Sequence, residues 1–270
     1  MSRLVRGLAL LLFACCASAP AAQRTLRVCA DADNLPYSDR AEAGFENAIA
    51  RLLARDLGAQ VEYSWRERQR GHQPATAEAD QCDVRLGVAT GAPALATTAP
   101  YYRASYVFLT RADRHLDISS FDDPRLAELT IGVQLPGSDA EGSPPVHALV
   151  QHGLIDNVDG YPPYVHRGAM PPPIVAAVAD GTLDVAVIWG PQAGYFAKRS
   201  AVPLHIELAA QESAGRWPMA LNIAVGVRAD DAALKNDIDD ALERERAMID
   251  RVLDAFGVPR SGKGEQVAEN

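Results

Sequence analysis

The stretch that most constrains the fold is residues 181–196, with the sequence GTLDVAVIWGPQAGYF. Residues 183–189 form a nearly continuous apolar run rich in β-branched side chains, which is typical of a strand buried on both faces, as in a parallel sheet. Gly190 and Pro191 end this run, and residues 192–199 are compatible with a helix. Ligands of open α/β sheets bind at the carboxyl edge of the strands. Trp189, the last residue of the predicted strand, is therefore a candidate for ligand contact.

The first 22 residues have the features of a secretory signal peptide. Arg3 and Arg6 precede an apolar core at residues 8–14, and small residues follow at 19–22. This core is too short to span a membrane, and no later segment reaches about 18 consecutive apolar residues. We therefore expect a soluble, periplasmic chain. The alternative is a lipid anchor on Cys15, because residues 12–15 loosely resemble a lipoprotein box with an uncommon Phe.

The net charge restricts the kind of binding partner, and the cysteine content leaves two possible states for the thiols. The formal net charge is −9, and it becomes −11 once Arg3 and Arg6 leave with the signal peptide. An acidic surface argues against nucleic acid and anionic membranes, and it suits a basic protein partner. Cys29 and Cys82 remain in the mature chain, both in expected strands. Either they form a disulfide in the oxidising compartment or they are two buried small hydrophobic side chains.

The order of strand and helix patterns predicts two α/β units. The expected strands are residues 26–30, 61–65, 82–89, 130–134, 157–161 and 183–189, and the expected helices are residues 45–57, 75–80, 146–152, 174–179, 192–199 and 231–256. The segments 82–87 and 183–190 both carry an Asp-Val pair at the start of an apolar strand that ends near a Gly. This internal echo, about a hundred residues apart, suggests two similar lobes.

Two β-rich segments, residues 105–110 and 218–228, are expected to cross between these lobes. We therefore predict a signal peptide at residues 1–22, a first lobe of residues 23–112 plus 218–260, a second lobe of residues 113–217 and a flexible tail at 261–270. The amphipathic face of the long helix at 231–256 is expected to pack on the first lobe.

This organisation resembles a type II periplasmic binding protein, in which two α/β lobes joined by two crossing segments enclose a cleft. The motifs that carry the resemblance are LRVCAD (26–31), GFEN (44–47), QCDV (81–84), TAPYY (98–102) and GTLDVA (181–186). Six longer blocks resemble one branch, the binding proteins associated with quinoprotein dehydrogenases in methanol oxidation, of MxaJ and XoxJ type. They are CADADNLPYS (29–38), GFENAIA (44–50), PYYRASYVF (100–108), IGVQLPG (131–137), DNVDGYP (156–162) and IWGPQAGYFA (188–197).

The resemblance implies a periplasmic accessory of a PQQ-dependent methanol or alcohol dehydrogenase, which binds that enzyme and assists its maturation or activation. One block departs from the branch, because residues 65–72 read WRERQRGH where the branch carries an aromatic and Arg-rich segment ending in Arg-Gly-Phe. By composition residues 66–71 form a solvated loop, and the alternative is a patch that binds an acidic ligand or partner.

The main alternative function is that of a substrate-binding protein of an ABC transporter. The resemblance implies that an amino-acid receptor of this fold holds its zwitterionic ligand with an Arg after the third strand and an Asp at the end of the second lobe's strand. Here residues 89–99 contain no Arg or Lys, and Trp189 occupies the second place. Buried unpaired charges are costly, so this pattern argues against an amino acid unless Arg103 or Asp139 supplies a charge from elsewhere. A neutral or aromatic ligand stays open as the alternative, on which Tyr37, Tyr101 and Trp189 would pack.

The residues expected to line the cleft come from the predicted carboxyl edges and the family blocks. They are Asp31, Asn34, Tyr37, Glu46, Thr90, Tyr101, Arg103, Gln134, Ser138, Trp189 and Gln192. A dehydratase-like reaction would use Asp31, Asp33 and Glu46, whereas the alternative gives the two aspartates loop hydrogen bonds and makes Glu46 a helix cap. We expect no catalysis. We also expect no cofactor and no metal, since His147 and His152 are five residues apart and no metal-ligand spacing occurs.

Overall fold

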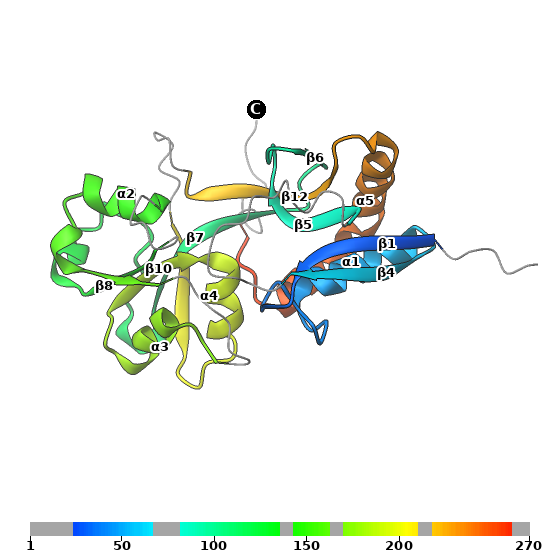
Figure 1. The fold of residues 1–270 in the computed structure, drawn as a ribbon. Coiled ribbons are helices and arrows are strands. Elements are labelled where there is room, and N and C mark those ends of the chain that lie inside the picture. Colours follow the sequence, from blue (N-terminus) through cyan, green and yellow to red (C-terminus); the bar gives the residue numbers. More distant parts are fainter. Residues whose placement is uncertain (1–23, 67–81, 136–142, 163–169, 210–217, 261–270) are drawn as a thin grey trace, which may run out of the picture.

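The computed structural model of the chain describes residues 24–66, 82–135, 143–162, 170–209 and 218–260 (Figure 1). The predicted signal peptide, the predicted helix at 75–80, the candidate Ser138 and the predicted flexible tail lie outside these ranges. So does most of the departing block at 65–72, of which Trp65 and Arg66 are described.

The described residues form five α-helices, three short 3₁₀ helices and two sheets. The α-helices are α1 (Phe45–Asp56), α2 (Pro144–Gln151), α3 (Pro173–Asp180), α4 (Gly190–Ala197) and α5 (Ala232–Ala255). The 3₁₀ helices are η2 (Ala112–Arg114), η3 (Pro124–Glu128) and η4 (Ile155–Asn157). The strands are β1 (Arg24–Asp31), β2 (Asp33–Asn34), β3 (Ser38–Asp39), β4 (Ala59–Arg66), β5 (Val84–Ala89), β6 (Leu95–Thr97), β7 (Tyr102–Arg111), β8 (Ile131–Gln134), β9 (Val158–Tyr161), β10 (Val185–Trp189), β11 (Leu204–Leu208) and β12 (Ala220–Arg228).

One sheet runs through both lobes in the order β4-β1-β5-β12-β7-β10-β8-β9, with β11 paired to β7 and β6 paired to β12. The strands β1, β4 and β5 run parallel in the first lobe, and β8, β9 and β10 run parallel in the second. The strands β7 and β12 are antiparallel to each other and join the two groups (Figure 1). The predicted α/β architecture with two crossing segments is confirmed.

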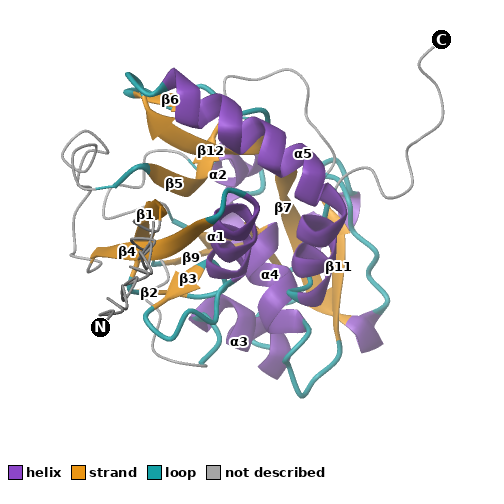
Figure 2. Cartoon of the chain, turned by 90° about the vertical axis from the view of Figure 1, so that its right-hand side faces the viewer, coloured by secondary structure: helices purple, strands orange, loops and turns teal. Residues whose placement is uncertain are grey.

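The core of the first lobe lies between its strands and the helices α1 and α5. Phe45, Ile49 and Leu53 of α1 are fully buried, at the helical spacing that the sequence shows. The helix α5 packs alongside α1 through a buried stripe that includes Ile238, as predicted (Figure 2). Gly44, before α1, lies so close to the preceding loop that an added Cβ would be 2.0 Å from the Tyr37 carbonyl oxygen.

The second lobe is organised around β10, whose residues 185–188 are all fully buried, as the apolar run predicted. The expected parallel pairing occurs on one side only, because β10 pairs parallel with β8 and antiparallel with β7. The strands β11 and β6 were not predicted. A leucine-rich segment with alternating polar residues forms β11 and pairs antiparallel with β7.

Candidate binding site between the two lobes

The carboxyl ends of the parallel strands in the two lobes face each other. β7 leads from the first lobe to the second, since its first residues pair with β12 and its later residues pair with β10. β5 and β7 are both antiparallel to β12, so β5 and its parallel neighbour β1 also run toward the second lobe. β10 is antiparallel to β7 and ends at Trp189, toward the first lobe. Ligands of α/β sheets bind at such carboxyl edges, and the candidate site therefore lies between them.

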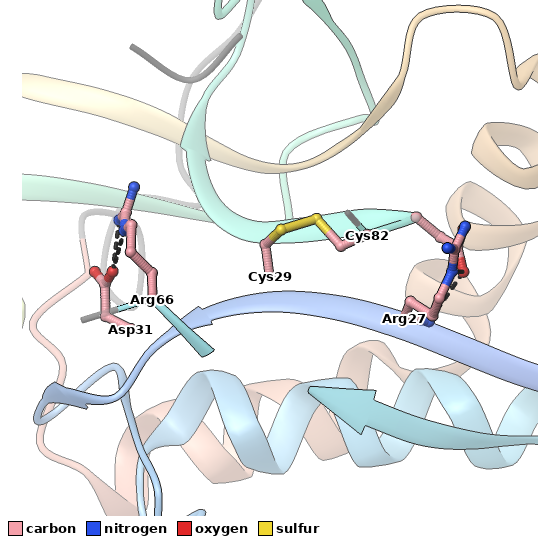
Figure 3. Close-up of a disulfide and its surroundings, with 6 residues drawn as sticks. Arg27, Cys29, Asp31, Arg66 and Cys82 are labelled. Carbon is pink, nitrogen blue, oxygen red and sulfur yellow. Dashed lines mark hydrogen bonds and ion pairs between the residues drawn. A yellow bond between two sulfur atoms is a disulfide. The ribbon is translucent and has the colours of Figure 1, made fainter. Parts of the chain in front are cut away.

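Asp31, at the end of β1, is neutralised by a neighbouring strand. Its Oδ1 lies 2.5 Å from Nη2 and 2.6 Å from Nε of Arg66, at the end of β4 (Figure 3). Its Oδ2 accepts a hydrogen bond from Nδ2 of Asn34 at 3.2 Å. Both side chains of this ion pair are largely buried. Asp31 is therefore a paired carboxylate, and its cation, Arg66, which was predicted to lie in a solvated loop, is the last residue of β4.

Glu46, in the first turn of α1, lies against Gly87 of β5. A Cβ on Gly87 would be 2.1 Å from Glu46 Oε1, so the carboxyl occupies the space that a side chain would take. Burial, and to a smaller extent the neighbouring Asp31, raise the pKa of this carboxyl to about 8, against a lowering by Arg85. At neutral pH the group is mostly protonated and can donate a hydrogen bond.

The interpretation of Glu46 as the cap of α1 is wrong. Asn47, one residue later, has that role, because its Oδ1 accepts a hydrogen bond from the backbone N–H of Gly44 at 3.2 Å. The backbone N–H groups of Phe45 and Glu46 donate to carbonyl oxygens of the preceding loop, at Pro36 (2.8 Å) and Tyr37 (2.9 Å). These two amides of the first turn are therefore already used within the chain.

Tyrosines surround this carboxyl on the first lobe. The hydroxyl of Tyr101 accepts a hydrogen bond from the backbone N–H of Gly87 at 3.2 Å. Burial raises the pKa of Tyr101 well above its usual value, and the nearby Glu46 and Tyr37 add to this shift. Tyr37 packs on Phe45, with the ring centroids 5.4 Å apart. The structure thus brings Asp31, Asn34, Tyr37, Glu46 and Tyr101 together at one edge of the first lobe.

The second lobe contributes residues to the candidate site mainly at the junction of β10 and α4. The Trp189 ring packs edge-on against Tyr106 of β7 with a centroid distance of 5.0 Å, and it also contacts the core of the first lobe. Gln192 follows in the first turn of α4 and is only 7% exposed. Gln134 is the last residue of β8 and is half-buried. The second lobe therefore presents an aromatic ring and neutral amides.

Two other candidates, Thr90 in the turn after β5 and Arg103 on the crossing strand β7, contact the same residue. The backbone N–H of Thr90 donates to the carbonyl oxygen of Asn222 in β12 at 2.9 Å. Nη1 of Arg103 donates to Oδ1 of Asn222 at 3.3 Å. Both residues therefore contact β12.

Two apolar residues of this region were missed from the sequence. Leu35 belongs to the turn-rich loop after β1, yet it is 9% exposed and packs in the core of the second lobe. Tyr106 lies opposite Trp189 in the strand register of β7 and β10. The sequence does contain a signal for Leu35, because it is an apolar residue among polar turn formers. An apolar side chain in such a loop is expected to pack against another part of the protein.

Of the two alternatives for the cysteines, the structure has the disulfide. Cys29 of β1 and Cys82, just before β5, are bonded, with 5.5 Å between their Cα atoms (Figure 3). The disulfide lies between two ion pairs, Asp31 with Arg66 and Arg27 with Asp83. It therefore fastens β1, which ends at Asp31, to the start of β5, the strand that carries Gly87.

Across the described ranges, no group of three or more His, Cys, Asp or Glu side chains is arranged to hold a metal ion. Within the same residues, no helix has the length and apolar character needed to cross a membrane.

Comparison with curated proteins finds two relatives of nearly full length, although no family model matches the chain. Protein MoxJ of Methylorubrum extorquens is 35% identical over 251 residues, which cover 87% of this chain and 81% of the relative. Protein MoxJ of Paracoccus denitrificans is 33% identical over 245 residues, which cover 87% of this chain and 88% of the relative.

Solved structures give the same result. MxaJ from Methlophaga aminisulfidivorans MPT superposes with a TM-score of 0.74 and 29% identity, over 87% of this chain and 99% of that one. The periplasmic binding protein XoxJ from Methylobacterium extorquens AM1 superposes with a TM-score of 0.71 and 31% identity, over 88% of this chain and all of that one. An ancestral cationic amino acid solute binding protein reaches a TM-score of 0.64 at 19% identity, a likeness of fold alone. The two-lobed fold predicted from the sequence, that of a type II periplasmic binding protein, is confirmed.

Proposed function

Because this chain belongs to the family of MoxJ, MxaJ and XoxJ proteins, which have the periplasmic binding protein fold, we propose that it is a periplasmic accessory of a PQQ-dependent methanol or alcohol dehydrogenase. In this role it binds the dehydrogenase and assists its maturation or activation. The observation that carries the proposal is the match to MoxJ proteins over 87% of the chain at 33–35% identity. The candidate signal peptide at residues 1–22 is consistent with the periplasmic location.

The chemistry between the lobes supports a role other than amino-acid capture. An amino acid needs a buried cation for its carboxylate and a buried anion for its ammonium group. The segment after β5, residues 89–99, contains no Arg or Lys, and β10 ends in Trp189. On the first lobe, Asp31 is paired with Arg66, and a Glu46 carboxyl with a pKa of about 8 is mostly uncharged at neutral pH. At these described positions, therefore, the chain offers neither of the two ions that a zwitterion requires.

The surface charge supports a basic protein as the partner. The chain carries a formal net charge of −9, and oppositely charged proteins associate faster and more specifically at low ionic strength. Association that depends on this charge weakens as salt is added, because exposed charges are screened within about 8 Å at physiological ionic strength.

The direct test is binding of the purified chain to the PQQ dehydrogenase from the same organism, measured by biolayer interferometry at low and high salt. We expect saturable binding that weakens with salt, together with a change in dehydrogenase activity or in the yield of active enzyme when the accessory is omitted during expression. An amino-acid receptor of the same fold serves as the control protein. No binding and no effect on the enzyme would contradict the proposal.

The same preparation tests the alternative function, transport of a small metabolite that is not an amino acid. A ligand at about a hundred times its dissociation constant adds ~2.7 kcal/mol to the free energy of unfolding, which raises the melting temperature by several degrees. A reproducible shift with one neutral metabolite, in the absence of dehydrogenase binding, would favour the transport function.

A further inference from the structure

The crossing strands are not the only connection between the lobes in the part of the chain that the structure describes. Side chains of each lobe also pack into the core of the other. Phe256, directly after α5, packs against the cores of both lobes. On the first lobe it meets the ring of Phe45 edge-on, with 5.9 Å between centroids. On the second lobe it stacks on the ring of Tyr195 in α4, with 5.8 Å between centroids and 18° between the ring planes. One aromatic side chain thus joins α1, the end of α5 and α4.

Next to this stack, α4 and the turn after α5 touch through their backbones. A Cβ on Gly194 of α4 would lie 1.8 Å from the carbonyl oxygen of Gly257, so only glycine fits at this point. Gly257 has a φ of +75°, a conformation that glycine adopts without strain. The glycine pair therefore sets a close approach of the second lobe to the end of α5.

A lysine of the second lobe completes the C-terminus of α5 in the first. Nζ of Lys198 donates hydrogen bonds to the carbonyl oxygens of Asp254 (3.2 Å) and Ala255 (2.9 Å). The last carbonyl groups of a helix have no partners within the helix, and a cation near them is favourable. Moving α4 away from α5 would remove this donor from both carbonyl groups.

Two further contacts bridge the lobes at the candidate site itself. Leu35, from the loop after β1, packs in the core of the second lobe, and Trp189, at the end of β10, packs against the core of the first. Rotating the lobes apart would withdraw both side chains and expose them to water. The space between the carboxyl edges is therefore bridged by the chain's own residues.

We infer that these contacts hold the two lobes in one arrangement without a ligand. The relative position of the lobes is then set by the chain itself and does not depend on ligand-induced closure. A ligand drives closure only through its differential affinity for the closed state. Where the chain itself stabilises one arrangement of the lobes, a ligand adds little further movement. The contacts exist whether or not a dehydrogenase binds, so this inference goes beyond the function proposed above.

The inter-lobe distance tests the inference directly. Spin labels on Asp240→Cys in α5 and Asp156→Cys in η4, both at exposed positions on different lobes, report the distance by pulsed electron paramagnetic resonance. The native cysteines of the mature chain are bonded and do not take the label. We expect one narrow distance distribution for the ligand-free protein. A broad or two-component distribution would overturn the inference.

Two matched pairs of variants identify the contacts responsible. Gly194→Ala forces α4 from the turn and should shift or broaden the distribution. Its control is Gly181→Ala, at a φ of +84°, which strains the backbone locally but whose added Cβ meets nothing within 4 Å, so the inter-lobe distance should not change. If Gly194→Ala does not fold, the exposed Lys198→Ala gives the same test. Its control is Lys235→Ala, whose ammonium pairs within α5 with Asp239. Equal distributions for Lys198→Ala and Lys235→Ala, or for the two glycine variants, would overturn the inference.

Discussion

The carboxylate of Asp83 accepts a hydrogen bond from the backbone N–H of Arg27 at 2.9 Å, and this contact has an equivalent in the second lobe. There, Asp184 Oδ2 accepts from the backbone N–H of Thr130, also at 2.9 Å. Each carboxylate also pairs with an arginine, Arg27 or Arg114, at 2.7 Å. The echoed Asp-Val pairs in the sequence are therefore equivalent anchors, each fixing the start of one parallel strand to its neighbour.

Removing either anchor should weaken its own lobe. Asp83→Ala and Asp184→Ala each leave a backbone N–H without its acceptor, and we expect each to lower the free energy of unfolding by about 1–3 kcal/mol in urea denaturation. Burial alone would raise the pKa of Asp83, but the hydrogen bonds from Arg27 hold it below its usual value. The stabilisation is therefore present above about pH 4 and is lost as the pH falls further.

The exposed Asp156→Ala, with an expected effect within about 0.5 kcal/mol, is the control. If Asp83→Ala or Asp184→Ala were no less stable than this control, the anchoring role would be wrong.

Local patterns predicted the elements of the fold well because each depends on residues near one another in sequence. The apolar run before Trp189 is the buried strand β10, and the spacing of Ile238 and Leu242 belongs to the buried face of α5. The family blocks and the two crossing segments then predicted that these elements form two lobes. The strand β11 was missed because its five residues are half-buried and pair only with β7.

The candidate site was less predictable because its properties depend on distant residues. The pKa of Glu46 is set by burial and by Asp31, and the carboxyl fills the space left by Gly87, 41 positions away in sequence. Asp31 is neutralised by Arg66, which the sequence placed in a solvated loop. Leu35 lies in a turn-rich loop of the first lobe, and its burial depends on the core of the second lobe. Apart from the apolar character of Leu35, no local pattern in the sequence reports such long-range contacts.

Removing the disulfide should destabilise the protein strongly. The bond joins positions 53 residues apart, and on a chain-entropy model it stabilises the folded state by about 4 kcal/mol. The double variant Cys29→Ser/Cys82→Ser should show this loss in urea denaturation and become insensitive to reductant. The unmodified protein should approach the stability of the double variant when reduced. An unchanged melting temperature of the unmodified protein in reductant would contradict this prediction.

The raised pKa of Glu46 makes stability depend on pH. Its folded-state pKa is about 8 and its ordinary value is 4.5, so between these values the folded protein keeps a proton that the unfolded chain has lost. This stabilisation is fully present below pH 4.5 and is lost as the pH rises through 8, with a slope of about 1.4 kcal/mol per pH unit in between. Glu46→Gln removes the dependence, so its stability relative to the unmodified protein should increase from pH 5 to pH 8.

Urea denaturation at pH 5, 6.5 and 8 measures this difference. Glu62→Gln, at an exposed position on β4, is the matched control and should follow the unmodified protein at every pH. Parallel pH profiles for Glu46→Gln and the unmodified protein would show that the carboxyl titrates in the same range when folded and unfolded.

The final prediction concerns Trp189, at the position where the resemblance to amino-acid receptors of this fold would put the carboxylate for the ligand's ammonium group. Trp189→Asp restores that carboxylate, but residues 89–99 still supply no Arg or Lys for the ligand's own carboxylate. We therefore expect no binding of arginine, glutamine or other amino acids by isothermal titration calorimetry. The variant should also lose about 2–4 kcal/mol of stability, because the packing of the indole on Tyr106 is removed. Trp189→Phe, which keeps an aromatic ring, is the stability control. Measurable binding of an amino acid by Trp189→Asp would show that the rest of the cleft already suits a zwitterion.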